Sequence, residues 1–132
     1  MEYVRLGWSG LKVSKICLGT MSFGDPALQH NGGGGWISGK DDAFKVMKRA
    51  WDLGINFYDT ANVYSMGKAE EILGEFMQGR RDDAVIATKV YFPTGEKPND
   101  SGLSRKHIFR QINESLRRRG GVEGQAKERQ AG

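Results

Sequence analysis

The chain has 132 residues, of which 38% are hydrophobic and 27% charged, a size and composition typical of one globular domain. Its net charge of +4 comes from the C-terminal end, where residues 105–132 hold 8 basic and 3 acidic side chains, so the charge does not indicate a folded nucleic-acid-binding face. One cysteine and two histidines can form neither an internal disulfide nor a Cys/His zinc site, and no apolar run approaches the roughly 18 residues of a membrane span. We therefore expect a cytoplasmic protein without metal, nucleic-acid partner or membrane insertion.

The N-terminal segment predicts short strands. Apolar residues on both sides of the turn 7–10 predict a β-hairpin. Residues 16–18, with the sequence Ile-Cys-Leu, predict a short buried strand in which Cys17 is a small core residue rather than a nucleophile. The following stretch, 24–40, is rich in glycine and polar residues and predicts a long loop.

Helices and strands then alternate. Asp41 and Asp42 predict the N-cap of a helix that ends at Gly54, and a strand over 55–58 follows. The next helix has one apolar face, formed by Ala69, Ile72, Leu73 and Phe76. The nearly continuous apolar run 84–88 predicts a parallel strand that is covered on both faces.

Ser104 predicts the N-cap of a third helix, in which Ile108, Ile112 and Leu116 share one apolar face. The chain therefore predicts a hairpin followed by βαβαβα, which implies a parallel sheet with right-handed crossovers. Residues 120–132 contain one large apolar side chain, and we expect this tail to be disordered.

Three polar side chains lie where the predicted strands end. Asp59 follows the strand 55–58, Tyr64 lies in the same loop, and Lys89 ends the strand 84–88. Functional groups of parallel α/β folds gather at these carboxyl ends, so the three side chains converge if the two strands are neighbours. From composition alone, a structural role as loop cap, packing residue and solvated strand end stays open.

An Asp, a Tyr and a Lys that converge suit carbonyl reduction, in which hydride reaches the carbon while an acid protonates the oxygen. A phenol, with an unperturbed pKa of about 10, donates reluctantly near neutral pH, and a neighbouring ammonium group helps by favouring the phenolate. Lys89 can supply this ammonium group, and a carboxylate such as Asp59 keeps the lysine charged.

Residues 54–64 closely resemble the Asp-Thr-Ala-x-x-Tyr signature of the aldo-keto reductases. Further matches occur in family order at residues 6–13, 18–21, 70–74 and 86–89, and together they cover about residues 3–119. The resemblance implies a (β/α)₈ TIM barrel, here an incomplete barrel of about three βα units preceded by an N-terminal β-hairpin.

The resemblance also implies NADPH-dependent reduction of aldehydes or ketones. It makes Tyr64 the general acid and Lys89 and Asp59 the pair that tunes it, and it places Gly19, Thr20, Met21 and Asp59 at the cofactor. Some proteins of this type are accessory subunits of membrane channels, so a non-catalytic role remains the alternative.

The chain departs from the family pattern at its C-terminal end. The family's fourth catalytic residue is a histidine after the next strand, whereas His107 lies within the third predicted helix and His30 in the glycine-rich loop. We expect residues 1–119 to be the N-terminal part of a barrel and 120–132 a tail outside the family pattern. We expect such a truncated fragment to be marginally stable, catalytically silent alone and able to self-associate through open sheet edges.

Overall fold

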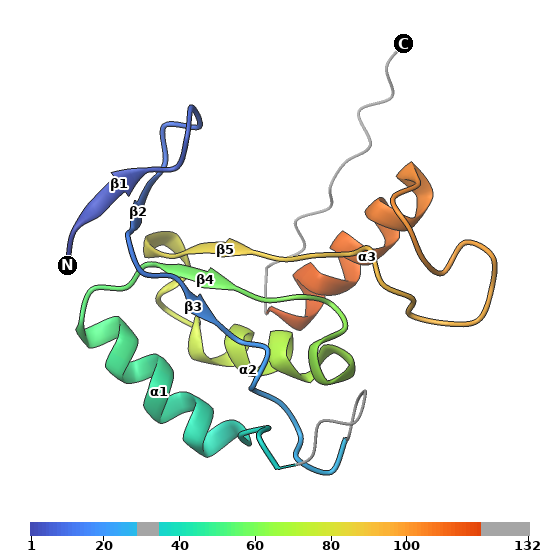
Figure 1. Cartoon of the computed structure of the whole chain (residues 1–132), viewed down its shortest axis with the longest axis horizontal. Coiled ribbons are helices and arrows are strands. Elements are labelled where there is room, and N and C mark those ends of the chain that lie inside the picture. The colour runs from blue at the N-terminus through green and yellow to red at the C-terminus, as the bar shows by residue number, and fades with distance from the viewer. Residues whose placement is uncertain (29–34, 120–132) are drawn as a thin grey trace.

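The computed structural model describes residues 1–28 and 35–119, so His30 and the predicted disordered tail 120–132 lie outside the described residues (Figure 1). The predicted hairpin is confirmed: β1 (Tyr3–Arg5) pairs antiparallel with β2 (Lys12–Ser14). The hairpin is attached to the amino end of the main sheet, because the Ser14 amide donates to Asn56 Oδ1 at 2.8 Å. Across the described ranges, no helix is long and apolar enough to cross a membrane.

The main sheet is parallel and has the order β3-β4-β5. Its strands are β3 (Leu18–Gly19), β4 (Phe57–Asp59) and β5 (Val85–Ala87), and the register aligns Gly19 with Asp59 and Asp59 with Ala87. The carboxyl ends of all three strands therefore lie at the same edge of the sheet. Figure 1 shows α1 (Lys40–Asp52) and α2 (Lys68–Phe76) on one side of this sheet and α3 (Arg105–Arg118) beyond the carboxyl end of β5.

The hydrophobic core lies between the sheet and the helices α1 and α2. The predicted apolar face of α2 is buried as a whole, and Met47 of α1 and Tyr58 of β4 pack in the same cluster. The predicted cap of α1 is wrong, because the N-cap is Gly39, whose carbonyl accepts from the Ala43 amide at 3.0 Å. Two acidic residues, 41 and 42, lie in the first helical turn instead, where they favour the helix dipole.

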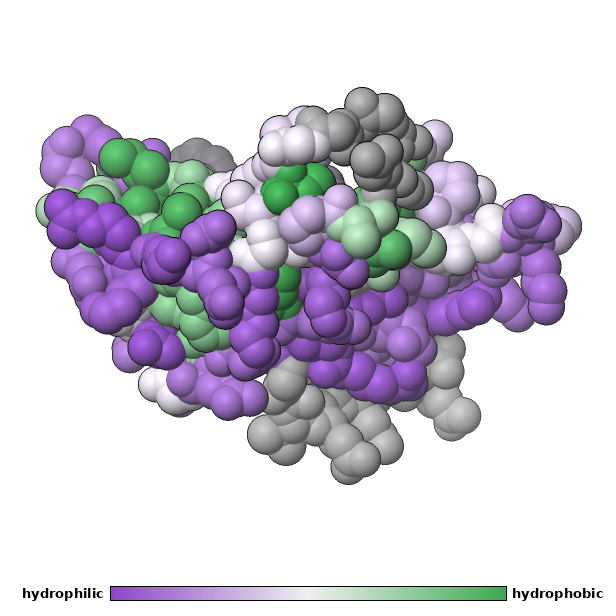
Figure 2. Space-filling model, turned by 90° about the horizontal axis from the view of Figure 1, so that it is seen from below, coloured by the Kyte–Doolittle hydropathy of each residue, from purple (hydrophilic) through white to green (hydrophobic). Residues whose placement is uncertain are grey.

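Two strand segments are less buried than predicted. Cys17 is exposed and Ile16 is 58% exposed, since both precede the two-residue strand β3 at the edge of the sheet. Strand β5, at the other edge, is only half-buried over its whole length, since α1 and α2 cover one side of the sheet (Figure 1). Both edges of the sheet are open in the described part of the chain. On the face shown in Figure 2, hydrophobic residues form separate patches in a mainly hydrophilic surface.

Helix α3 begins as predicted, with Ser104 Oγ accepting from the His107 amide at 3.1 Å. The apolar residues that share one face of α3 do not form its most buried face, because Ile108 is exposed and Ile112 and Leu116 are half-buried. The helix instead buries its polar residues, which are His107, Gln111 and Ser115. Of these, His107 meets backbone carbonyls of the loop 90–103, and Gln111 meets the side chains of Asn62 and Thr94.

Candidate active site

The structure brings Asp59, Tyr64 and Lys89 together at the carboxyl edge of the sheet. Asp59 is the last residue of β4, Tyr64 begins the short helix η1 (Tyr64–Gly67), and Lys89 follows β5 by two residues. The Lys89 ammonium group donates to Asp59 Oδ2 at 2.6 Å and to the Tyr64 hydroxyl at 3.1 Å. A third hydrogen bond, to the Thr60 carbonyl at 3.0 Å, uses the remaining donor of Lys89.

The electrostatics of this group keep the lysine charged. Partial burial alone would lower the pKa of Lys89, but the hydrogen bonds from Lys89 to Asp59 and Tyr64 outweigh it and raise this pKa above its ordinary value. The ammonium group also lies 5.0 Å from the centre of the Tyr64 ring. Because the Tyr64 oxygen accepts from Lys89, its own proton is free to be donated elsewhere.

The loop that carries Tyr64 is tied to the neighbouring strand. The Thr60 amide donates to the Ala87 carbonyl at 2.9 Å, and the Asn62 amide donates to the Lys89 carbonyl at 3.2 Å. After Tyr64 the backbone enters the left-handed region at Ser65 and Met66, with φ of 46° and 53°. This conformation is rare for residues with a side chain and concentrates at functional sites.

The residues expected at the cofactor have different environments. Gly19 pairs with Asp59 in the sheet register and is exposed. Thr20 is fully buried, and both its amide and its hydroxyl donate to the Asp59 carbonyl, at 2.9 and 3.1 Å. Met21 is 56% exposed and lines a cavity next to Tyr64. Thr20 therefore fixes the backbone of Asp59, whereas Met21 is available to a bound molecule.

This cavity has a volume of about 530 Å³ and opens beside Tyr64 and Lys89. Its other walls are mostly apolar or aromatic and include Trp36, Tyr91 and Phe92. The rings of Tyr91 and Phe92 meet edge to face, with centres 5.5 Å apart. Sequence reasoning missed this aromatic pair, although its place directly after the Lys89 strand end was the signal that could have found it.

The cavity fits one end of a nicotinamide cofactor better than the whole molecule. Its mostly apolar and aromatic walls suit an aromatic ring, and the buried atoms Asn62 Oδ1 and Ser65 Oγ in the Tyr64 loop have no hydrogen-bond partner in the protein. In the described part of the chain, Lys89 is the one basic residue that lines the cavity. A pyrophosphate needs further cations or helix N-termini, which the lining of this cavity does not supply.

The structure also separates His107 from the site. Both of its ring nitrogens contact backbone carbonyls, and it does not line the cavity. Within residues 1–28 and 35–119, no three side chains of His, Cys, Asp or Glu gather closely enough to hold a metal ion.

Comparison with known proteins shows which family this chain resembles. The sequence profile of the Aldo/keto reductase family matches residues 15–123. The chain is 38% identical over 140 residues to the versiconal hemiacetal acetate reductase of Aspergillus parasiticus, covering 91% of this chain and 39% of that protein. It is 42% identical over 125 residues to a putative voltage-gated potassium channel subunit beta of Schizosaccharomyces pombe, covering 87% of this chain and 32% of that protein.

Among solved structures, an aldo-keto reductase from Bacillus halodurans in its holo form superposes with a TM-score of 0.71 at 32% identity, covering 92% of this chain and 37% of that one. The chain thus spans between 32% and 39% of the length of these three relatives. Its three parallel strands form an incomplete version of the (β/α)₈ barrel of its structural relatives. The chain belongs to the aldo/keto reductase family.

Proposed function

We propose that this site serves the NADPH-dependent reduction of small aldehydes or ketones, with Tyr64 as the general acid. The observation that carries the proposal is the Lys89 ammonium group, which lies 3.1 Å from the Tyr64 hydroxyl and 2.6 Å from Asp59. An ammonium group at this position stabilises the phenolate that remains after Tyr64 has given up its proton. Asp59 in turn keeps the ammonium group charged and in place.

A nicotinamide cofactor, when bound, would supply the hydride that the carbonyl carbon accepts. The electron pair of the C=O π bond moves to the oxygen, and the Tyr64 hydroxyl protonates this oxygen, so an alcohol and a Lys89-stabilised phenolate result. Water then returns a proton to Tyr64. Gly19, Thr20, Met21 and Asp59 are the residues that we propose at the nicotinamide end, with Met21 in contact and Thr20 holding the backbone of Asp59.

Because the chain spans about two fifths of its relatives' length, we propose that it is a fragment that is catalytically silent alone, in a cytoplasmic setting. Its open sheet edges favour self-association. The unit that carries the site is proposed to be residues 1–119. Completion of the cavity by further strands would then be required for turnover.

The test is a titration of NADPH fluorescence with purified chain, together with a carbonyl reduction assay and circular dichroism on the same sample. Saturation at micromolar NADPH, followed by turnover that Tyr64→Phe abolishes, would support the general acid and contradict the expected silence of the chain. Binding without turnover would support a fragment. A folded chain that binds no NADPH would contradict a cofactor site in this part of the barrel.

A second candidate is a non-catalytic accessory subunit of a channel, which the likeness to the putative potassium channel subunit beta of Schizosaccharomyces pombe favours. A chimaera separates the two functions. In it, residues 1–119 of this chain take the place of the matching part of the Bacillus halodurans aldo-keto reductase. If that chimaera folds and reduces carbonyl compounds, and Lys89→Met removes the activity, the chain carries a working proton donor. A folded chimaera that binds NADPH without turnover favours the accessory role.

A further inference from the structure

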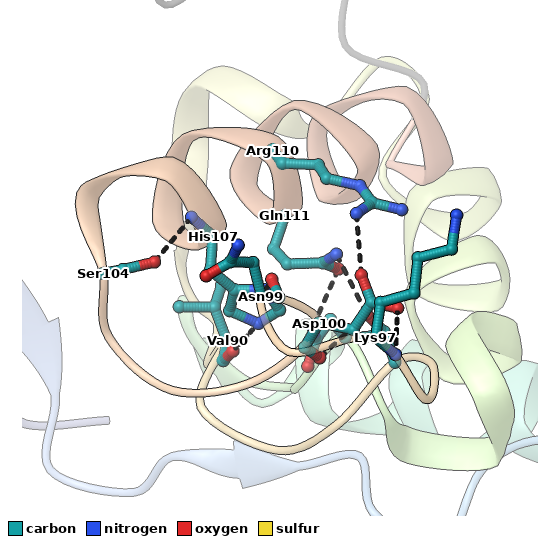
Figure 3. Close-up of polar contacts among 10 residues, drawn as sticks. Val90, Lys97, Asn99, Asp100, Ser104, His107, Arg110 and Gln111 are labelled. Carbon is teal, nitrogen blue, oxygen red and sulfur yellow. Dashed lines mark hydrogen bonds and ion pairs between the residues drawn. The ribbon is translucent and has the colours of Figure 1, made fainter.

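The buried polar face of α3 holds two loops that form the cavity. Figure 3 shows His107 pointing from α3 into the loop 90–103, where Nε2 contacts the Val90 carbonyl at 2.8 Å and Nδ1 the Asn99 carbonyl at 3.2 Å. Both partners only accept hydrogen bonds, so a neutral ring donates to one of them and an imidazolium to both. The two contacts join the start and the end of the loop to one side chain.

Gln111, one helical turn later, joins this loop to the loop that carries Tyr64. Its Oε1 accepts from Asn62 Nδ2 at 3.0 Å, and its Nε2 donates to Thr94 Oγ1 at 3.2 Å. The loop is fastened once more where Arg110 pairs with Asp100 at 2.9 Å (Figure 3). The helix therefore spans both walls of the cavity with direct hydrogen bonds.

These contacts lie next to Tyr91 and Phe92, which form the aromatic wall of the cavity. Tyr91 and Phe92 follow directly on Val90, the residue that His107 contacts, and both line the same cavity as Tyr64. They are themselves 58% and 61% exposed, so packing of their rings fixes them only weakly. Their position relative to Tyr64 depends on the hydrogen bonds behind them.

A helix that served stability alone would bury its apolar stripe. Here Ile108 is exposed, while His107 and Gln111 are buried at 0% and 3% exposure. Burial of these polar side chains costs free energy unless their hydrogen bonds are made. Because the hydrogen bonds form in one conformation of the loop, they favour that conformation. We propose that His107 and Gln111 are positioning residues that hold the Tyr91–Phe92 wall at a set distance from Tyr64, an inference that rests on the proposed carbonyl reductase site.

The test compares His107→Leu with Lys106→Leu, the same replacement at the exposed neighbouring position. A second pair, Thr94→Val and Thr94→Ser, removes and then restores the hydroxyl at an exposed position where the fold is not at risk. Two quantities are measured on the full chain: amide hydrogen exchange in peptides over 91–103, and the Kd of naphthaldehyde as an aromatic carbonyl probe.

We expect exchange over 91–103 to become about tenfold faster in His107→Leu and about fivefold faster in Thr94→Val, with a matching rise in the naphthaldehyde Kd. Lys106→Leu and Thr94→Ser should match the wild type, and peptides of α1 and α2 should not change in any variant. Unchanged exchange in both loss variants, or acceleration spread over the whole chain, would overturn the proposal. A wild-type chain that does not bind naphthaldehyde would count against the proposed function, and the exchange pattern alone then decides the positioning role.

Discussion

Glu70 and Arg118 form a buried ion pair whose removal tests how α2 and α3 are joined. The Glu70 carboxylate is fully buried, and it accepts from Arg118 Nη1 at 3.0 Å and from the Thr88 hydroxyl at 2.7 Å. Arg118 is itself largely buried, with 24% of its side chain exposed. Replacement by Met keeps much of the packing volume of Arg118 but leaves the carboxylate of Glu70 buried without its cation.

The expected cost of Arg118→Met is about 3 kcal/mol, the low end of the range of about 3 to 5 kcal/mol for a broken buried ion pair, because the Thr88 hydroxyl and the charge of Arg119 still stabilise the Glu70 carboxylate. This is a large share of the roughly 5 to 15 kcal/mol that stabilises an ordinary domain. The double variant Glu70→Leu with Arg118→Met should recover part of the loss, since Glu70 is then no longer left without Arg118, although the buried Arg119 loses the carboxylate that raises its pKa. Urea unfolding followed by circular dichroism measures all three variants, and simple additivity of the two single losses would refute the reasoning.

Three further measurements test the effects of packing and burial. Gly74→Ala should destabilise the chain by about 1 to 3 kcal/mol in thermal unfolding, because its Cβ would lie 2.5 Å from the Arg119 Cα, whereas Gly19→Ala, whose Cβ meets nothing within 4 Å, should be near neutral. Burial raises the pKa of Tyr58 to about 12, so as the pH rises the unfolded chain loses this proton before the folded chain does. Between pH 10 and 12 the free energy of unfolding should therefore fall by roughly 2 kcal/mol more in the wild type than in Tyr58→Phe. The pKa of Cys17 is raised, first by partial burial and then by the Asp59 carboxylate. Iodoacetamide should therefore label Cys17 more slowly than free cysteine at pH 8, and faster labelling would contradict this prediction.

The sequence predicts those parts of the fold that depend on local pattern. The face of α2 follows from helical spacing, and the meeting of Asp59 with Lys89 follows from the alignment of strand ends in a parallel sheet. The burial of β5 was overestimated because an apolar run indicates two covered faces, whereas α1 and α2 lie on one side of this sheet.

The features that the sequence did not predict depend on how a loop packs. The apolar spacing of α3 indicates a buried stripe at Ile108, but backbone carbonyls of the loop 90–103 select the polar stripe at His107 instead. Tyr91 and Phe92 become part of the site through the same loop. Helical periodicity carries no information about unpaired carbonyls on a neighbouring segment, so this choice of face lies beyond pattern analysis.

The loop after β4 forms a closed ring of contacts with the end of β5. Backbone amides of Thr60 and Asn62 donate to the carbonyls of Ala87 and Lys89, and the Lys89 side chain returns a hydrogen bond to the Thr60 carbonyl. Tyr64 and Lys89 thus belong to one hydrogen-bonded unit built from two adjacent strands. The distance between the Tyr64 hydroxyl and the Lys89 ammonium group is therefore set within these two strands and their loops. Further strands of a larger barrel can enclose this pair but are not needed to form it.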